Sequence, residues 1–207
     1  MVQGATGTWA RNLSCVQVVV GVMRGIIALT STALLAACSS ASGPRPEGPT
    51  GLQGGAPLVR NCASAVFGEP NSENAVSLGP LMLVGIPQAA RLSSRAFKPH
   101  DGRYSAIKVL AVVMGPNDVT VTVPSSQRHW VSLLYDPTAQ ATRNGFLLSA
   151  GDPRVIFKGC QGGEPQYNGG FIATKPGCVR LEIESRTSST SDWISLGAGD
   201  SCPTDEK

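Results

Sequence analysis

Charged and aromatic residues are both scarce in this chain of 207 residues, at 15% for Asp, Glu, Lys and Arg and 5% for Phe, Trp and Tyr. The formal net charge is only +3, which is too small for a protein that binds nucleic acid by neutralising phosphates, so we expect no nucleic-acid partner. The hydrophobic content of 42% is too high for a disordered tail. One folded domain is therefore expected.

Catalytic motifs are also missing. The chain contains no G-x-S-x-G, H-E-x-x-H, P-loop or G-x-G-x-x-G motif, and no CxxC pair. Its two histidines, His100 and His129, do not lie at ligand spacing from any cysteine, so we expect no metal and no cofactor. We predict that the protein is not an enzyme.

Two catalytic alternatives stay open as hypotheses. Ser105 and Lys108 match the S-x-x-K pair of penicillin-binding proteins and serine β-lactamases, but a strand would direct them to opposite sides. A Ser/His/Asp site assembled from distant residues is the second alternative, with either histidine beside Asp101 or Asp136. It would make the protein a small hydrolase.

The uncharged apolar run that ends the N-terminal region is short, with 13 residues from Gly25 to Ala37 after Arg24. A membrane helix needs roughly 20 apolar residues, whereas the hydrophobic part of a secretory signal has about 7 to 15. We therefore predict an export signal in residues 1–37. The upstream residues fit a signal poorly, so translation starting at Met23, which would exclude Cys15, is a hypothesis.

Leu35-Ala36-Ala37-Cys38 closes this run with an aliphatic residue, two small residues and a cysteine. The sequence resembles the lipobox of bacterial lipoprotein precursors. The resemblance implies that signal peptidase II cleaves between Ala37 and Cys38, and that a diacylglyceryl group is attached to the Cys38 thiol. The expected location is the extracytoplasmic side of the cell membrane, with the membrane as a partner through this lipid.

Residues 38–57, which follow the lipobox, are dense in Gly, Pro and Ser. This composition predicts a flexible tether with a reach of about 25 Å. Residues 58–207 are then the folded domain.

Period-two alternation of apolar and polar residues dominates this domain, most clearly in 119–123 and 179–183. The apolar segment 107–114 predicts one central strand, with a helix as the rival interpretation. Further strands are expected at 81–86, 130–135, 154–158, 170–173 and 192–196, separated by Gly, Pro and Asn turn signals.

We therefore predict an all-β fold, an immunoglobulin-like β-sandwich of about eight short antiparallel strands, with a small β-barrel as the alternative. The segments Tyr167-Asn168-Gly169-Gly170-Phe171 and Pro176-Gly177-Cys178-Val179 resemble parts of actinobacterial lipoproteins and secreted proteins. That resemblance implies no known activity. It leaves a binding or accessory role in the cell envelope as the expected function.

Four cysteines remain when Cys15 and Cys38 are set aside, and an even number in an exported chain predicts disulfides. Three pairings are possible. We expect Cys160 to pair with Cys178 across one hairpin and Cys62 to pair with Cys202 across the ends of the domain.

The most basic stretch of the domain is residues 91–103, here called the basic segment. It contains Arg91, Arg95, Lys98 and Arg103 against the single acid Asp101. Arginines suit phosphate groups, so these four residues are candidates for binding an anion. Expected partners are an envelope protein, an anionic envelope polymer or phospholipid headgroups, and a solvated loop is the alternative.

Overall fold

The computed structural model describes residues 56–141 and 144–203, all of which belong to one compact unit. The predicted signal peptide, the lipobox with Ala37 and Cys38, and nearly all of the tether lie outside the described residues.

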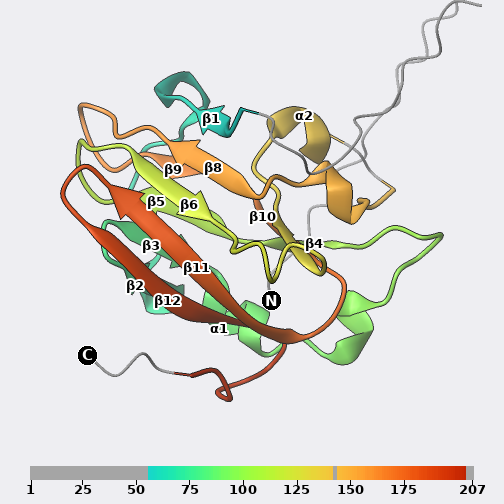
Figure 1. The fold of residues 1–207 in the computed structure, drawn as a ribbon. Helices are drawn as coiled ribbons and strands as arrows, with labels where there is room; N and C mark the ends of the chain where they lie inside the picture. The colour runs from blue at the N-terminus through green and yellow to red at the C-terminus, as the bar shows by residue number, and fades with distance from the viewer. Residues whose placement is uncertain (1–55, 142–143, 204–207) are drawn as a thin grey trace, which may run out of the picture. The chain divides into compact units, whose positions relative to one another are not determined.

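Twelve strands in three open sheets make the described part an all-β sandwich (Figure 1). One sheet has the order β1-β8-β6-β11-β12, with β1 Leu58–Arg60, β6 Val119–Thr122, β8 Arg154–Phe157, β11 Gly177–Ser185 and β12 Ser189–Leu196. A second has the order β2-β3-β5-β9, with β2 Ala75–Leu78, β3 Leu81–Val84, β5 Leu110–Val113 and β9 Gln166–Tyr167. The third has the order β4-β10-β7, with β4 Ala106–Lys108, β7 Val131–Leu133 and β10 Gly170–Ala173.

The helices of the described residues are short. They are α1 (Ile86–Ala90) and α2 (Pro137–Gln140), with 3-10 turns at η1 (Cys62–Ser64), η2 (Ser72–Asn74), η3 (Ser94–Phe97) and η4 (Leu148–Ala150). Each α-helix has proline in its first turn, a position where a missing N–H costs no hydrogen bond.

Apolar side chains of the five-stranded and four-stranded sheets form one continuous core, and Figure 1 shows the first sheet in front of the second. Strand β11 explains the pattern: Val179, Leu181 and Ile183 are fully buried, while the residues between them are exposed. The period-two prediction is confirmed here. Its physical basis is that successive side chains of a strand point to opposite faces.

Strands β7 and β10 of the third sheet are buried on both faces. In β10, Phe171 belongs to the main core, whereas its neighbour Ile172 packs in a second cluster with Leu134 and Phe146. Gly170 is required at the start of this strand, because a Cβ there would lie 1.9 Å from the carbonyl oxygen of Ile107. The backbone of β10 can therefore approach β4 closely.

The prediction of one central strand over 107–114 is wrong. The segment is divided into β4 and β5, which belong to different sheets. Between them Val109 donates its N–H to the carbonyl of Gly169, at 3.0 Å, instead of continuing either ladder. The apolar composition correctly indicates burial of most of this segment. No pattern of neighbouring residues, however, marks the point at which the chain leaves one sheet and enters another.

Three other strands, β1, β2 and β9, are absent from the prediction, and the strand count of about eight was too low. The pair formed by β1 and β8 is parallel, with Arg60 opposite Phe157, in a fold expected to be antiparallel throughout. The small β-barrel is also wrong, since every sheet of the described residues is open.

Both predicted disulfide pairings are wrong, although all four cysteines are paired. The bonds join Cys62 to Cys160 and Cys178 to Cys202. Parallel pairing explains the first bond, because Cys62 and Cys160 both follow the same ends of the neighbouring strands β1 and β8. The chain after β12 brings Cys202 back to Cys178, which lies opposite Ser195 in the β11–β12 ladder. In the chain-entropy model, bonds with separations of 98 and 24 residues contribute roughly 5 and 3.5 kcal/mol.

Arg60, at the end of β1, is a buried cation with 4% of its surface exposed, and it forms no ion pair with any described residue. Its guanidinium donates to the carbonyl oxygens of Tyr135 and Asn168 and to Ser64, and lies 5.5 Å from the centre of the Tyr167 ring. Arg60 therefore connects β1, the end of β7 and the turn between β9 and β10.

We predict that R60A lowers the free energy of unfolding by about 2 to 4 kcal/mol, because the buried carbonyl of Tyr135 and the partly buried acceptors of Asn168 and Ser64 lose their donor. Denaturant unfolding of the oxidised protein measures this change. R186A is the control, since Arg186 is exposed at the tip of the β11–β12 hairpin and should change stability by less than about 0.5 kcal/mol. Equal stabilities for the two variants would contradict the role assigned to Arg60.

Candidate functional site

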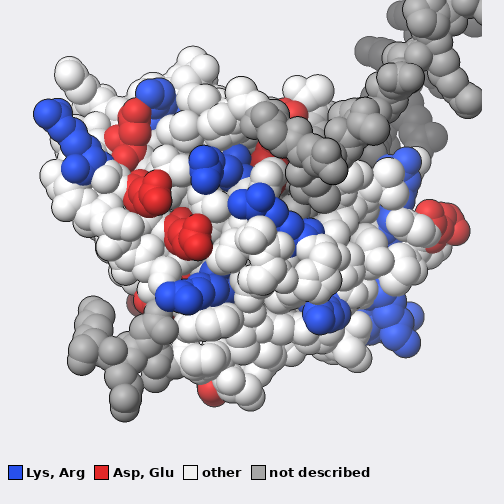
Figure 2. All heavy atoms as spheres, in the orientation of Figure 1, with Lys and Arg blue, Asp and Glu red and all other residues white. Residues whose placement is uncertain are grey.

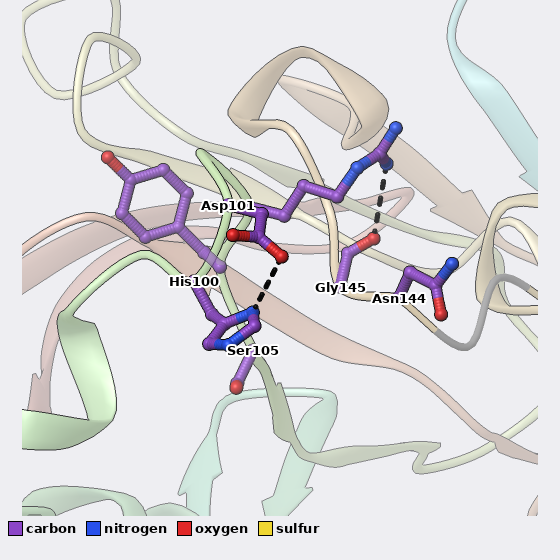
Figure 3. Close-up of a pocket in the computed structure, with 7 residues that line it drawn as sticks. His100, Asp101, Ser105, Asn144 and Gly145 are labelled. Atoms are coloured by element: carbon purple, nitrogen blue, oxygen red, sulfur yellow. Dashed lines mark hydrogen bonds and ion pairs between the residues drawn. The ribbon is translucent and has the colours of Figure 1, made fainter.

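A pocket of about 600 Å³ opens beside the hairpin that ends the basic segment (Figure 3). It is lined by two neighbouring pieces of chain, His100, Asp101, Arg103, Tyr104, Ser105, Asn144 and Gly145. Most of the lining side chains are polar, so the pocket is suited to a polar or charged group.

The hairpin is formed by mutual hydrogen bonds between His100 and Arg103, with N–O distances of 2.8 and 2.9 Å. The two residues at its tip, Asp101 and Gly102, have φ angles of 50° and 73°. Positive φ at both central residues is the geometry of a type I′ turn, for which Asp-Gly is a preferred sequence.

The second piece of the pocket is held against the first by pairing of Tyr104 with Phe146, with N–O distances of 2.8 and 2.9 Å. Gly145 directly precedes Phe146 and has a φ of 77°, and a Cβ at this position would be 3.0 Å from the carbonyl oxygen of Tyr104. Phe146 is buried in the second apolar cluster. The pocket is thus fixed to the fold by this contact.

His100, Asp101 and Ser105 lie together on the rim of the pocket, as Figure 3 shows. The Nδ1 atom of His100 is 3.2 Å from Oδ2 of Asp101, and the two side chains are 95% and 87% exposed. No hydrogen bond joins Ser105 to His100 within the described part of the chain. These are the residue types of a hydrolytic site, but they are held in open solvent.

The four candidate anion-binding residues are all exposed. Arg91 caps the end of α1, Arg95 lies in η3, Lys98 follows η3, and Arg103 belongs to the hairpin. None of them forms an ion pair with another described residue. In Figure 2, Lys and Arg side chains gather at the right-hand edge of the visible face, with acidic atoms beside them.

Buried apolar side chains fix this segment to the domain. Phe97 is 3% exposed and is part of the main core, against which Leu92 and Ala96 also pack. The cations are therefore displayed from a backbone that is held on the core by the residues between them.

The S-x-x-K pair is separated by the fold. Ser105 lines the larger pocket, whereas Lys108 lines a second one of about 380 Å³ with Val84, Val109, Leu110, Gln140, Asn168 and Gly169. The two residues are separated, but not within one strand as expected, because β4 begins at Ala106 and Ser105 precedes it. His129, the other histidine, lies at neither pocket and is exposed.

Four residues with shifted pKa values lie outside the larger pocket. Burial raises the pKa of Tyr135 and of Tyr167, and Arg60 opposes the shift in both cases. Burial also lowers the pKa of Arg60 itself, and it raises the pKa of Asp152, with a smaller contribution from Asp136. These shifts accompany the packing around Arg60 and the end of β7.

Residues 56–141 and 144–203 have neither a metal-ligand cluster nor a membrane-spanning helix. Those residues contain no group of three or more His, Cys, Asp or Glu side chains placed to hold a metal ion. They also contain no helix with the length and hydropathy needed to cross a membrane.

No family model, curated protein or solved structure matches this chain. The chain is therefore described by its own fold and site. It is a disulfide-bonded all-β sandwich with an exposed basic segment at a polar pocket.

Asn144 and Gly145 were missed as site residues. Their dipeptide is a turn signal in the sequence, but nothing in the local pattern places it against a hairpin some 40 residues earlier. The hydrogen bond from Arg103 to the carbonyl of Gly145, at 3.4 Å, is visible only in the fold.

We predict that G145A is more destabilising than G102A. Both glycines have left-handed backbones, with φ of 77° and 73°, but only Gly145 has neighbours within 4 Å of an added Cβ. G102A should cost about 1 kcal/mol for backbone conformation alone, and G145A should cost an additional 1 kcal/mol or so for the contact with Tyr104. Thermal unfolding of the two variants compares them, and equal losses would show that the close approach is relieved without cost.

Proposed function

We propose that the protein is an extracytoplasmic lipoprotein, anchored in the cell membrane through Cys38, whose folded domain is a non-enzymatic binding or accessory module of the cell envelope. The observation that carries the proposal is the arrangement of the cysteines in the chain. All four cysteines after Cys38 form disulfides, as in proteins of oxidising compartments, and Cys38 lies at the end of a lipobox-like sequence.

The anchor accounts for membrane retention without a spanning segment. Each buried CH₂ of an acyl chain contributes about 0.8 kcal/mol, so two or three chains on Cys38 give stable attachment. Removal of residues 1–37 leaves a mature chain with a formal net charge of +1, so the lipid, rather than overall charge, provides the attachment.

A binding role for the domain is supported by the exposure of its site. The pocket residues His100 and Asp101 are almost entirely in solvent, and the four cations of the basic segment are exposed. An exposed arrangement of this kind can contact a large partner. Electrostatic stabilisation of a transition state, by contrast, is strongest where water is excluded.

We predict that C38S abolishes lipidation and signal cleavage of the full chain, because only a thiol accepts the diacylglyceryl thioether. Intact-mass and peptide mass spectrometry of the membrane fraction, without reduction, measures both. C15S is the matched control and should leave processing unchanged. Acylation elsewhere, or a wild-type chain with an unmodified Cys38, would overturn the proposed anchor.

A small envelope hydrolase is the second candidate, favoured by the convergence of His100, Asp101 and Ser105 on one pocket. In such a site the Ser105 oxygen attacks an ester carbonyl while His100 takes its proton and returns it to the leaving alcohol. Water then hydrolyses the acyl-serine, and Asp101 orients the imidazole.

This candidate predicts that the purified protein hydrolyses a nitrophenyl ester, and that S105A and H100A each lower the rate by about 100-fold or more. S125A is the control, since Ser125 is exposed and lines neither pocket. Wild-type hydrolysis no faster than that of S105A would eliminate the hydrolase and leave the binding module.

A further inference from the structure

Positive charge is concentrated in one segment of the domain. Residues 91–103 hold four Lys and Arg and one Asp, whereas the rest of the described residues hold eight Lys and Arg and ten Asp and Glu. One of those eight, Arg60, is buried. Among the described residues, the surface outside the basic segment is therefore net negative, so this part of the chain has a charge polarity that the small net charge conceals.

The cations of the segment are available to a ligand. They are exposed, they form no ion pair with a described residue, and the backbone that carries them is held on the core by Phe97. Because folding fixes this backbone, binding of an anionic surface does not have to order the segment, which reduces the entropic cost of association.

We propose that the basic segment is the membrane-facing surface of the domain and binds the anionic headgroups of the phospholipid bilayer. This inference rests on the proposed anchoring at Cys38, because a tether with an expected reach of about 25 Å keeps the domain next to the bilayer at high effective concentration. Under those conditions weak contacts suffice. Lys and Arg are attracted to anionic lipid within about 10 Å of the surface, the distance over which salt screens charge.

The pocket at the end of the basic segment offers hydrogen-bond donors for the phosphate of a single headgroup. Its lining includes the Arg103 guanidinium, the Ser105 hydroxyl and the Asn144 amide, all of which can donate to phosphate oxygens. The Arg103 side chain makes one hydrogen bond within the described residues, to the carbonyl of Gly145, which leaves other guanidinium N–H groups for a ligand. A lipid phosphate is therefore the group expected to enter the pocket.

The test uses the full lipidated protein in two kinds of vesicle, phosphatidylcholine alone and phosphatidylcholine with phosphatidylglycerol. Amide hydrogen exchange over residues 91–105 is the measurement. We expect slower exchange only in the anionic vesicles, loss of this protection at high salt, and a fall of about fivefold in protection for each cation neutralised.

The key variant is R91Q/R95Q/K98Q/R103Q, and the matched control is R154Q/K175Q/R180Q/R186Q, which removes the same charge from exposed sites elsewhere. If loss of Arg103 disturbs folding, the triple variant R91Q/R95Q/K98Q replaces the quadruple variant, because it leaves the pocket hairpin unchanged. Only the variants of the basic segment should lose protection. Equal losses in the control would show attraction by net charge alone and overturn the proposal.

Two further outcomes would also overturn it. Exchange that is the same in both kinds of vesicle excludes headgroup binding. Protection by added polyphosphate on neutral vesicles, without protection on anionic ones, assigns the segment to an anionic polymer instead. Failure of the proposed anchor is recognised separately, since an unacylated chain shows the wrong mass and does not stay on either vesicle.

Discussion

The parallel pairing of β1 with β8 is the constraint on which the rest of the sandwich depends. It places Arg60 among the end of β7 and the β9–β10 turn, and it places Cys62 beside Cys160. A buried guanidinium without an acidic partner is tolerated only where carbonyl oxygens surround it. Burial of Arg60 therefore requires all the segments that supply those oxygens to be in place, and the Cys62–Cys160 disulfide links the chain after β1 to the chain after β8.

In this arrangement, the residues that stabilise the fold are different from the residues proposed to bind a partner. The buried cation and the sheet interface lie in the sandwich, whereas the polar pocket and the basic segment lie on connections outside its sheets. Surface connections on a rigid scaffold are where binding residues are usually found. Here Phe97 and Phe146 tie those connections to the two apolar clusters, so the surface is displayed in a defined shape without weakening the core.

Prediction succeeded where the pattern was local. Strands β6, β10 and β11 and the all-β class were found from residues within a few positions of one another. It failed where a segment changed sheets, as between β4 and β5, and for short strands such as β1, whose three residues carry too little periodicity. For the site, the exposed cations were identified from composition, but the contribution of Asn144 and Gly145 was not.

The sequence by itself determined the β class, the alternation that divides core from surface, the lipobox-like segment and the cluster of positive charge, because each is a property of neighbouring residues. Only the tertiary structure decided the disulfide pairing and the composition of the pocket. Both depend on segments far apart in the chain, 98 residues for Cys62 and Cys160. Strand pairing brings such segments together through backbone hydrogen bonds, which nearly every residue can form, so the choice of partner leaves little trace in local sequence.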